Sequence, residues 1–351
     1  MRRASHLETI DGLRALAVLA VLGYHALVYA WTGTAPAWIA CGARGVDLFF
    51  AISGFCLAFP YLRAYRSAGV LEIGYGRFMV RRIARIVPPY LAALALFALL
   101  SLTSFGLPTA PGVHLTPAAA LRELGLESVF LTDLSPAYDA SFWTLGVEMR
   151  WYLLFPLLLE LYVRSRMGFY LVGGLCYALY FLTPWSVADE GTLPCFMLGI
   201  VAADLHLANS PLRRFAPVAA VVTLAAAALW QSRVDWVDHG NPLWHAAAFS
   251  LVVASGSGLF ARALRWKALA FTGVASYSIY LIHQPVLDAL AAAGAPAPLA
   301  AAAALACGFA FYFAVERRAL DPRFRKPAEA LLSKVLTPLL KRPIRAVRSG
   351  S

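Results

Sequence analysis

The sequence predicts an all-α, polytopic membrane protein, a helical bundle with about ten transmembrane helices. Of its 351 residues, 60% are hydrophobic and only 14% are charged, and the mean hydropathy is +0.67. This composition is typical of integral membrane proteins. Apolar runs of about 20 residues recur along the chain, the length that an α-helix needs to cross a bilayer. The short alternating strands of a membrane β-barrel are not found.

The apolar runs divide the chain into spans, with boundaries accurate to about four residues. We expect them at residues 13–32, 46–62, 87–105, 143–163, 168–184, 191–208, 214–230, 243–260, 272–292 and 297–316. The membrane domain then covers residues 1–320, and a basic tail follows over 321–351. An even number of spans places both termini on one side of the membrane.

The basic residues indicate which side this is. Of the 30 Lys and Arg residues, 26 fall on the termini and on the loops that share their side. The positive-inside rule therefore predicts cytoplasmic termini in a cell inner membrane. The net charge of +11 reflects this topology and attraction to anionic lipid, and it requires no nucleic acid. An alternative is that Arg2 and Arg3 begin a cleaved secretory signal, which would remove the first span.

The first span carries two ionisable residues, Arg14 and His25. They are eleven residues apart, about three helical turns, so they lie on one face and about 16 Å apart along the axis. An ionisable residue in the middle of a span is a functional-site hypothesis by default, because burying it is costly. The structural alternative is a histidine that hydrogen-bonds a neighbouring helix.

Four further stretches carry polar groups where apolar ones are expected. Their candidate site residues are Asp47 and Ser53 in the second span, Arg82 and Arg85 before the third, Trp143, Glu148 and Tyr152 in the fourth, and His283 in the ninth. If these helices are neighbours, two imidazoles and two carboxylates converge in the outer half of the membrane, with the arginines at its inner mouth. Structural interpretations remain open: a helix cap for Asp47, a pair with Arg150 for Glu148, and interfacial anchors for the arginines.

Taken in order, these residues resemble the motifs of acyltransferase family 3, integral membrane acyltransferases of the O-antigen acetylase type. The matching segments are Arg14 with His25, the Gly-Val-Asp-Leu-Phe-Phe stretch with Ser-Gly-Phe at 45–55, Arg82 with Arg85, the segment from Trp143 to Tyr152, and the Ser-Tyr segment that ends at His283. The sequence departs from the family at Met149, Arg150 and Trp151, where Glu, Gln and Phe are usual. No second acid is therefore expected beside Glu148.

The resemblance implies transfer of an acyl group, usually acetyl, from a cytoplasmic acyl-CoA-type donor, acetyl-CoA by preference, to a hydroxyl of a surface glycan such as lipopolysaccharide O-antigen or exopolysaccharide. A neutral imidazole is suited to remove the hydroxyl proton near pH 7, so His25 is the candidate base. Asp47 would set its tautomer, and Glu148 completes the catalytic candidates. A covalent acyl-His25 intermediate is a second route.

The other candidates have binding roles. Arg14, Arg82 and Arg85 would hold the donor phosphates. Ser53, Trp143, Tyr152 and His283 are acceptor-binding or structural candidates. No metal is expected, because no HExxH motif or other closely spaced set of ligands occurs.

Two other function classes fit the composition. In a proton-coupled transporter or flippase, the buried His, Asp and Glu residues would form a proton relay, but the inverted repeats and paired broken helices frequent in such proteins are not evident. A non-catalytic scaffold would leave the mid-span His25 and His283 unexplained.

Overall fold

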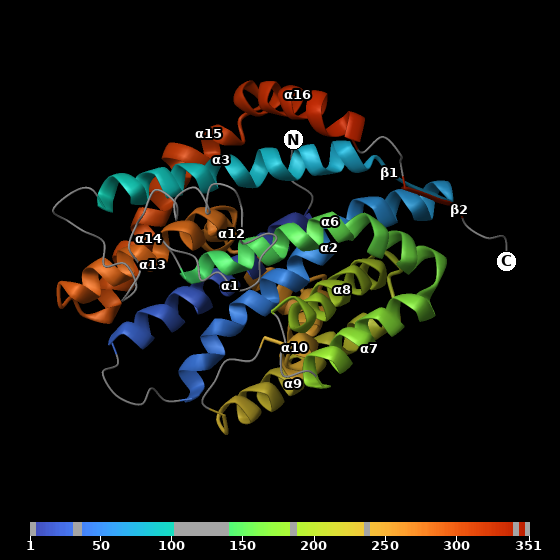
Figure 1. The fold of residues 1–351 in the computed structure, drawn as a ribbon. Helices are drawn as coiled ribbons and strands as arrows, with labels where there is room; N and C mark the ends of the chain where they lie inside the picture. The colour runs from blue at the N-terminus through green and yellow to red at the C-terminus, as the bar shows by residue number, and fades with distance from the viewer. Residues whose placement is uncertain are drawn as a thin grey trace.

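The computed structural model describes residues 5–30, 37–101, 140–182, 188–234, 239–339 and 344–347, and most of them are helical (Figure 1). The helices are α1 (Ser5–Ala30), α2 (Gly45–Ala68), α3 (Tyr75–Ser101), α6 (Trp143–Arg164), α7 (Arg166–Leu182), α8 (Ala188–Leu207), α9 (Ala216–Gln231), α10 (Pro242–Ala254), α11 (Gly258–Leu264), α12 (Lys267–Val274), α13 (Ser276–Ala292), α14 (Ala297–Phe311), α15 (Arg317–Ala319) and α16 (Pro322–Leu339). Short 3₁₀ turns, η1 (Ala37–Arg44), η2 (Ala140–Phe142) and η3 (Pro211–Phe215), precede α2, α6 and α9, and a π-helix, η4 (Tyr312–Glu316), follows α14.

A helical membrane protein is thus supported, but the predicted count of ten spans is not confirmed. Within the described ranges, four helices are long and apolar enough to cross a membrane, at Glu8–Val28, Trp38–Ala68, Pro211–Gln231 and Ala297–Ala319. A fifth span is possible only if α10 and α11, which meet at 88°, count as one. The other predicted spans correspond to helices that carry several charges, as α3 and α6 do, or that are shorter.

The structure extends two of the helices that carry arginines well before their predicted starts. α1 begins at Ser5, so Arg14 lies about 14 Å inside the helix. α3 begins at Tyr75, which places Arg85 about 15 Å along it. Both helices thus deliver guanidinium groups into the protein and not only to its inner edge.

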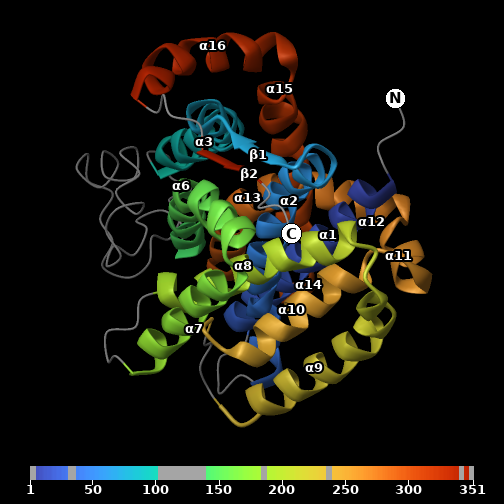
Figure 2. The ribbon, with the colours of Figure 1, turned by 90° about the vertical axis from the view of Figure 1, so that its right-hand side faces the viewer.

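Helix α2 lies at the centre of the bundle, between α1, α6, α8 and α10 (Figures 1 and 2). Its closest neighbour is α8, and two glycines allow this approach. A Cβ on Gly54 would lie 2.0 Å from the carbonyl oxygen of Phe196, and one on Gly199 would lie 2.1 Å from that of Ala51. Small residues at a helix crossing let the two backbones touch, a common feature of membrane helix pairs.

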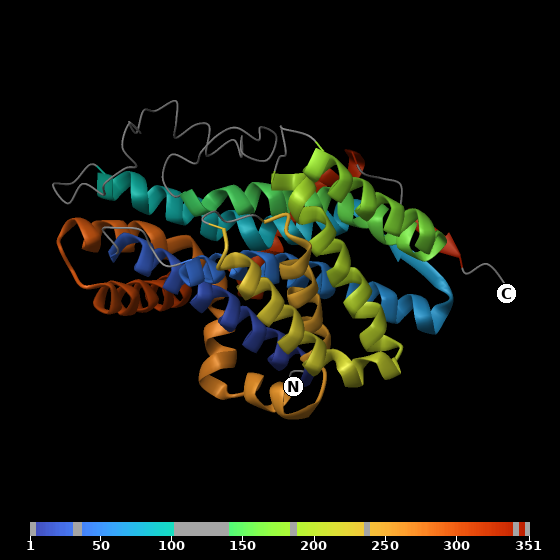
Figure 3. The same cartoon turned by 90° about the horizontal axis from the view of Figure 1, so that it is seen from below.

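The N-terminal half of α1 is fixed against the α11–α12 corner, drawn in orange in Figure 3. A Cβ on Gly12 would lie 2.2 Å from the carbonyl oxygen of Leu264, and one on Gly273 would lie 1.6 Å from that of Asp11. This contact sets the height and rotation of α1, and with them the position of Arg14.

Two long apolar helices are exposed on the outside of the bundle. Only 17% of the apolar window of Pro211–Gln231 and 28% of that of Ala297–Ala319 is buried within the protein. Apolar helix surface without a protein neighbour is suited to lipid, so α9 and α14 give the bundle its lipid-facing sides.

The segment after residue 320, predicted as a basic tail, is folded onto the bundle. α16 packs along α3 (Figure 2), and β2 (Ile344–Val347) pairs antiparallel with β1 (Val70–Ile73), which joins α2 to α3. Hydrogen bonds from Arg323 to Asp321 in the turn before α16 lower the pKa of the Asp321 carboxyl.

Several loops predicted to share one side of the membrane do meet in the structure. Arg66 near the end of α2 and Arg166 at the start of α7 both pair with Asp204 near the end of α8, at 2.7 and 2.9 Å. The β1–β2 pairing adds the C-terminal segment to this side.

Candidate active site

A cavity of about 310 Å³ opens between α1, α2, α3, α6, α13 and the π-helix η4. It is lined by most of the polar residues that the sequence singles out, namely Arg14, Ser53, Arg82, Arg85, Glu148 and Tyr152. Apolar side chains such as Phe49, Ile52 and Leu145 complete the wall. Residues from four separate stretches of the sequence therefore share one site.

The three arginines differ in how far their charges are compensated. Arg14 lies 3.7 Å from Asp11 and donates to the sulfur of Cys56. Among the described residues, Arg82 and Arg85 form no ion pair, and the buried Nε of Arg82 has no hydrogen-bond partner. Guanidinium groups left unpaired in a cavity are suited to bind phosphate or carboxylate.

Glu148 is held by hydroxyl groups rather than by an arginine. Ser53 on α2 donates to its Oε1 at 2.8 Å, and Tyr152, one turn further along α6, donates to the same oxygen. The predicted alternative, a pair between Glu148 and Arg150, is not formed. Because both donors engage Oε1, Oε2 has no hydrogen bond among the described residues and is free to accept one from a ligand in the cavity.

The cavity also contains polar residues that the sequence analysis missed. Glu316 is delivered by the π-helix that ends the span at α14, and its Oε2 accepts from the hydroxyl of Ser278 at 2.5 Å and from its backbone N–H at 3.2 Å. A carboxylate in an otherwise apolar run was the available signal. Its position at the very end of the predicted span, 297–316, makes this signal weak. Tyr277 and Tyr280 of α13 line the same wall.

His25 and His283 lie beside the cavity and not in its wall. Nδ1 of His25 is 2.8 Å from Nε2 of His283, and the two ring planes are inclined by 20° with centroids 5.0 Å apart. Nδ1 of His283 is 2.7 Å from the backbone oxygen of Tyr280, whose side chain lines the cavity. The two imidazoles predicted at the same depth therefore contact each other.

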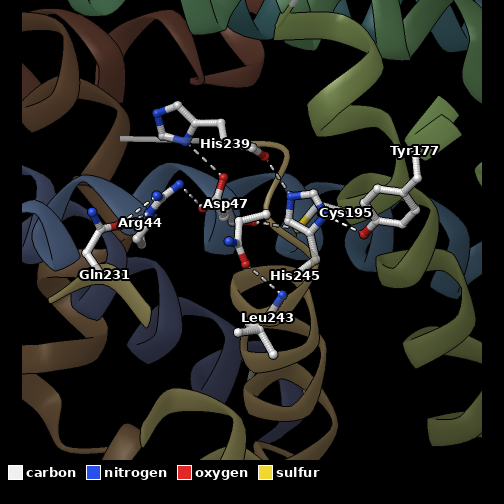
Figure 4. Close-up of polar contacts among 9 residues, drawn as sticks. Arg44, Asp47, Tyr177, Cys195, Gln231, His239, Leu243 and His245 are labelled. Carbon is white, nitrogen blue, oxygen red and sulfur yellow. Dashed lines mark hydrogen bonds and ion pairs between the residues drawn. The ribbon is translucent and has the colours of Figure 1, made fainter. Parts of the chain in front are cut away.

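Asp47 does not reach His25, although the sequence analysis assigned it to orient that ring. Figure 4 shows it in a separate cluster, where Oδ1 accepts from Nδ1 of His239 at 2.9 Å and Oδ2 lies 3.6 Å from Arg44. Arg44 in turn donates to Gln231 at 2.7 Å. Asp47 lies at the start of α2. The sequence predicts how deep a residue lies in the membrane, but not toward which neighbouring helix its side chain points.

His239 is the second residue that the sequence analysis missed. It lies between α9 and α10, outside any apolar run, so no pattern marked it. The Nε2–H of His245 donates to its backbone oxygen at 2.7 Å, and Tyr177 donates to Nδ1 of His245 at 2.6 Å (Figure 4). The ring of Trp143, a predicted acceptor residue, lies 5.3 Å from that of His239.

The two imidazoles and two carboxylates that were expected to converge thus lie in three neighbouring groups. Glu148 belongs to the cavity, His25 and His283 form a pair beside it, and Asp47 joins the Arg44–His239 cluster. In the part of the chain that the structure describes, no three His, Cys, Asp or Glu side chains are arranged to hold a metal ion.

Comparison with known proteins identifies relatives that are named as O-acetyltransferases. Relatives in Staphylococcus aureus include a "putative O-acetyltransferase" of strain COL, 26% identical over 324 aligned residues that cover 82% of this chain and 52% of that protein. They also include O-acetyltransferase OatA of strain NCTC 8325, 23% identical, with 80% and 51% covered. The chain thus spans about half the length of the curated relatives it matches. No solved structure matches.

The family model that matches is described as an acyltransferase domain, and it covers residues 7–317. That range includes the arginine-lined cavity, the histidine pair and the Asp47 cluster. The chain belongs to the acyltransferase 3 family.

Proposed function

We propose that this protein is a membrane O-acyltransferase, with acetyl as its acyl group, that uses a cytoplasmic acyl-CoA-type donor and a glycan hydroxyl as acceptor. The observation that carries the proposal is the cavity. It combines two guanidinium groups that have no ion-pair partner among the described residues with a carboxylate that keeps one oxygen open. Family membership and relatives named as O-acetyltransferases support the same reaction class.

The arginines bind the donor. Arg82 and Arg85 offer planar, multiply donating groups that match phosphate oxygens, and Arg14 extends this basic surface. A cavity of about 310 Å³ is at the small end of the range for ligand pockets. It therefore holds the part of the donor next to the arginines, while the rest of a molecule as large as CoA extends beyond it.

His25 acts as the general base. The hydroxyl oxygen of the acceptor attacks the thioester carbonyl as its proton passes to the imidazole. The carbon–sulfur bond then breaks, and the thiolate of the donor takes the proton back from the imidazolium. A positioned base contributes on the order of 10²–10⁴ to the rate of such a transfer. This step needs the acyl group to extend past the wall at Tyr280 toward His25.

Glu148 and its hydroxyl partners bind the acceptor. The free Oε2 of Glu148 accepts from a sugar hydroxyl, while Ser53 and Tyr152 keep the carboxylate fixed. The acceptor is a surface glycan such as O-antigen or exopolysaccharide. The protein resides in the cell inner membrane with its β1–β2 side toward the cytoplasm, where the donor is made.

The donor assignment is tested with purified protein in lipid nanodiscs, by measuring acetyl-CoA binding and acetyl transfer to surface glycan. The test variants are Arg82→Lys and Arg85→Ala. Losing one charge-assisted contact costs about 1.5–3 kcal/mol, so donor binding should weaken by about 10- to 150-fold. Lys keeps the charge of Arg but loses its planar fork, so Arg82→Lys should also bind poorly.

Arg81→Ala is the matched control. Arg81 lies on the same helix, is exposed and donates to the hydroxyl of Tyr61 at 3.1 Å, outside the cavity wall. The Arg81→Ala variant should bind the donor normally. Wild-type binding by the Arg82 and Arg85 variants, or equal losses in all three, would show that these arginines are only anchors at the lipid surface.

A further inference from the structure

The histidine pair contains a directional chain of hydrogen bonds that begins at a backbone carbonyl. The oxygen of Tyr280 lies 2.7 Å from Nδ1 of His283, and Nε2 of His283 lies 2.8 Å from Nδ1 of His25. Each contact has the length of a good hydrogen bond. A carbonyl oxygen has no proton to give, so the direction of the chain is fixed at this end.

The tautomer of each ring follows from that direction. His283 must carry its proton on Nδ1 to bond Tyr280, which leaves a lone pair on Nε2. That lone pair can only accept, so His25 carries its own proton on Nδ1. The unprotonated nitrogen of His25 is then Nε2.

The two rings also differ in solvent exposure and in whether a nitrogen is free. His283 is 1% exposed, and both of its nitrogens are engaged within the protein. His25 is only partly buried, and its Nε2 has no hydrogen-bond partner among the described residues. The buried ring is thus placed to orient, and the open ring is placed to react.

We propose that His283 is the positioning residue of the acyl transfer: it fixes His25 in the tautomer whose Nε2 accepts the proton of the acceptor hydroxyl. His283 takes the place that a carboxylate has in a hydrolase triad. When Nε2 of His25 takes the proton, its Nδ1–H remains bonded to Nε2 of His283, which helps to stabilise the imidazolium. The inference rests on the proposed function, because it requires that His25 is the base.

The test compares two substitutions that introduce side chains of similar length, His283→Gln and His283→Met. The Gln side chain can turn its amide oxygen toward Nδ1 of His25 and accept the same hydrogen bond, whereas the Met thioether is a weak acceptor. Acetyl transfer is measured as kcat and as KM for acetyl-CoA, per folded molecule in nanodiscs. In metal sites, losing the partner that orients a histidine ligand costs about 10- to 100-fold, and we expect a loss of the same order here.

The expected result is a fall in kcat of that size for His283→Met with unchanged KM for the donor, and recovery of most of the rate in His283→Gln. If His283 had a purely structural role, the Gln and Met variants, whose side chains are of similar length, should have similar kcat values. Full activity in His283→Met, or equal losses in both variants, would overturn the proposal.

The His25→Ala variant distinguishes a failure of the base assignment from a failure of the positioning role. If it loses transfer while His283→Met keeps it, the base assignment stands and only the positioning role fails. If His25→Ala transfers at the wild-type rate, the base assignment itself is wrong and the positioning role falls with it.

Discussion

His25 and His239 each have one ring nitrogen bonded to a side chain, but their partners differ in charge. His25 contacts the neutral ring of His283, and in the part of the chain that the structure describes no carboxylate lies among its contacts. His239 donates to Asp47, whose other oxygen lies close to Arg44. The first arrangement leaves an uncharged ring with a free nitrogen, which suits a base. The second is a network around the buried Arg44–Asp47 ion pair, and it ties η1 and the start of α2 to the segment before α10.

An acid beside a histidine does not by itself identify a catalytic pair. Buried ion pairs are often kept for the geometry that they specify rather than for net stability. Both partners in the Asp47 cluster are buried, with Asp47 at 1% and Arg44 at 4% exposure. We therefore assign structure to the Asp47 cluster and chemistry to the histidine pair, and three substitutions and a rescue experiment test that division.

The largest effect is expected for His25→Gln. Glutamine keeps a hydrogen bond to His283 but cannot take up a proton near pH 7. The transfer rate should fall by about 10²–10⁴, with normal membrane insertion and normal acetyl-CoA binding, because Arg14 lies about 16 Å away along the helix. Transfer per folded molecule and donor binding, measured in the same nanodisc preparation, check this. Transfer close to the wild-type rate would make His25 a structural residue.

Asp47→Ala is expected to reduce stability first. It removes the ion pair between Asp47 and Arg44 and one hydrogen bond of His239. Removing one member of a buried pair typically costs about 3–5 kcal/mol. Thermal unfolding in detergent measures this loss.

Glu160→Ala is the control for Asp47→Ala. Its pair with Arg164 is of similar sequence spacing but lies toward the surface, with 58% of the Arg164 side chain exposed. Such pairs are worth about 0–1 kcal/mol. If the two substitutions lower stability equally, or if Asp47→Ala loses transfer without losing stability, the structural assignment of this cluster is wrong.

The smallest effect is expected for His239→Gln. The Gln amide can still donate to Asp47, so the network persists, and the side chain of His239 is 19% exposed. The free energy of unfolding should fall by about 1 kcal/mol, and transfer per folded molecule should stay near that of the wild type. A kinetic loss as large as that of His25→Gln would move the catalytic role to His239.

The sequence singled out several of the charged residues that share the cavity, for reasons that also explain where its expectations differ from the structure. Arg14, Arg82, Arg85 and Glu148 were singled out because charges inside apolar runs are costly, and the structure brings them to one cavity. Depth along a helix follows from residue number, so His25 and His283 were correctly expected at one level. The direction of a side chain around the axis depends on helix packing, such as the glycine contacts of α1, and this led to the wrong partner for Asp47.

In the fold, too, features set by local sequence were predictable, and features that depend on tertiary contacts were not. Each predicted span overlaps a helix, and α6 and α7 begin within two residues of the expected positions. The predicted span count is not confirmed where charge and length conflict, as in α3, or where the chain bends, as between α10 and α11. The β1–β2 pair joins segments more than 270 residues apart, which no local pattern can indicate.

Chemical rescue tests the central claim most directly. His25→Ala leaves a partly open site next to His283, into which added imidazole can diffuse. We predict that acetyl transfer by His25→Ala is very slow and rises with imidazole concentration, whereas His239→Ala does not respond. Rescue of His239→Ala alone, or wild-type transfer by His25→Ala without imidazole, would contradict the assignment of His25 as the base.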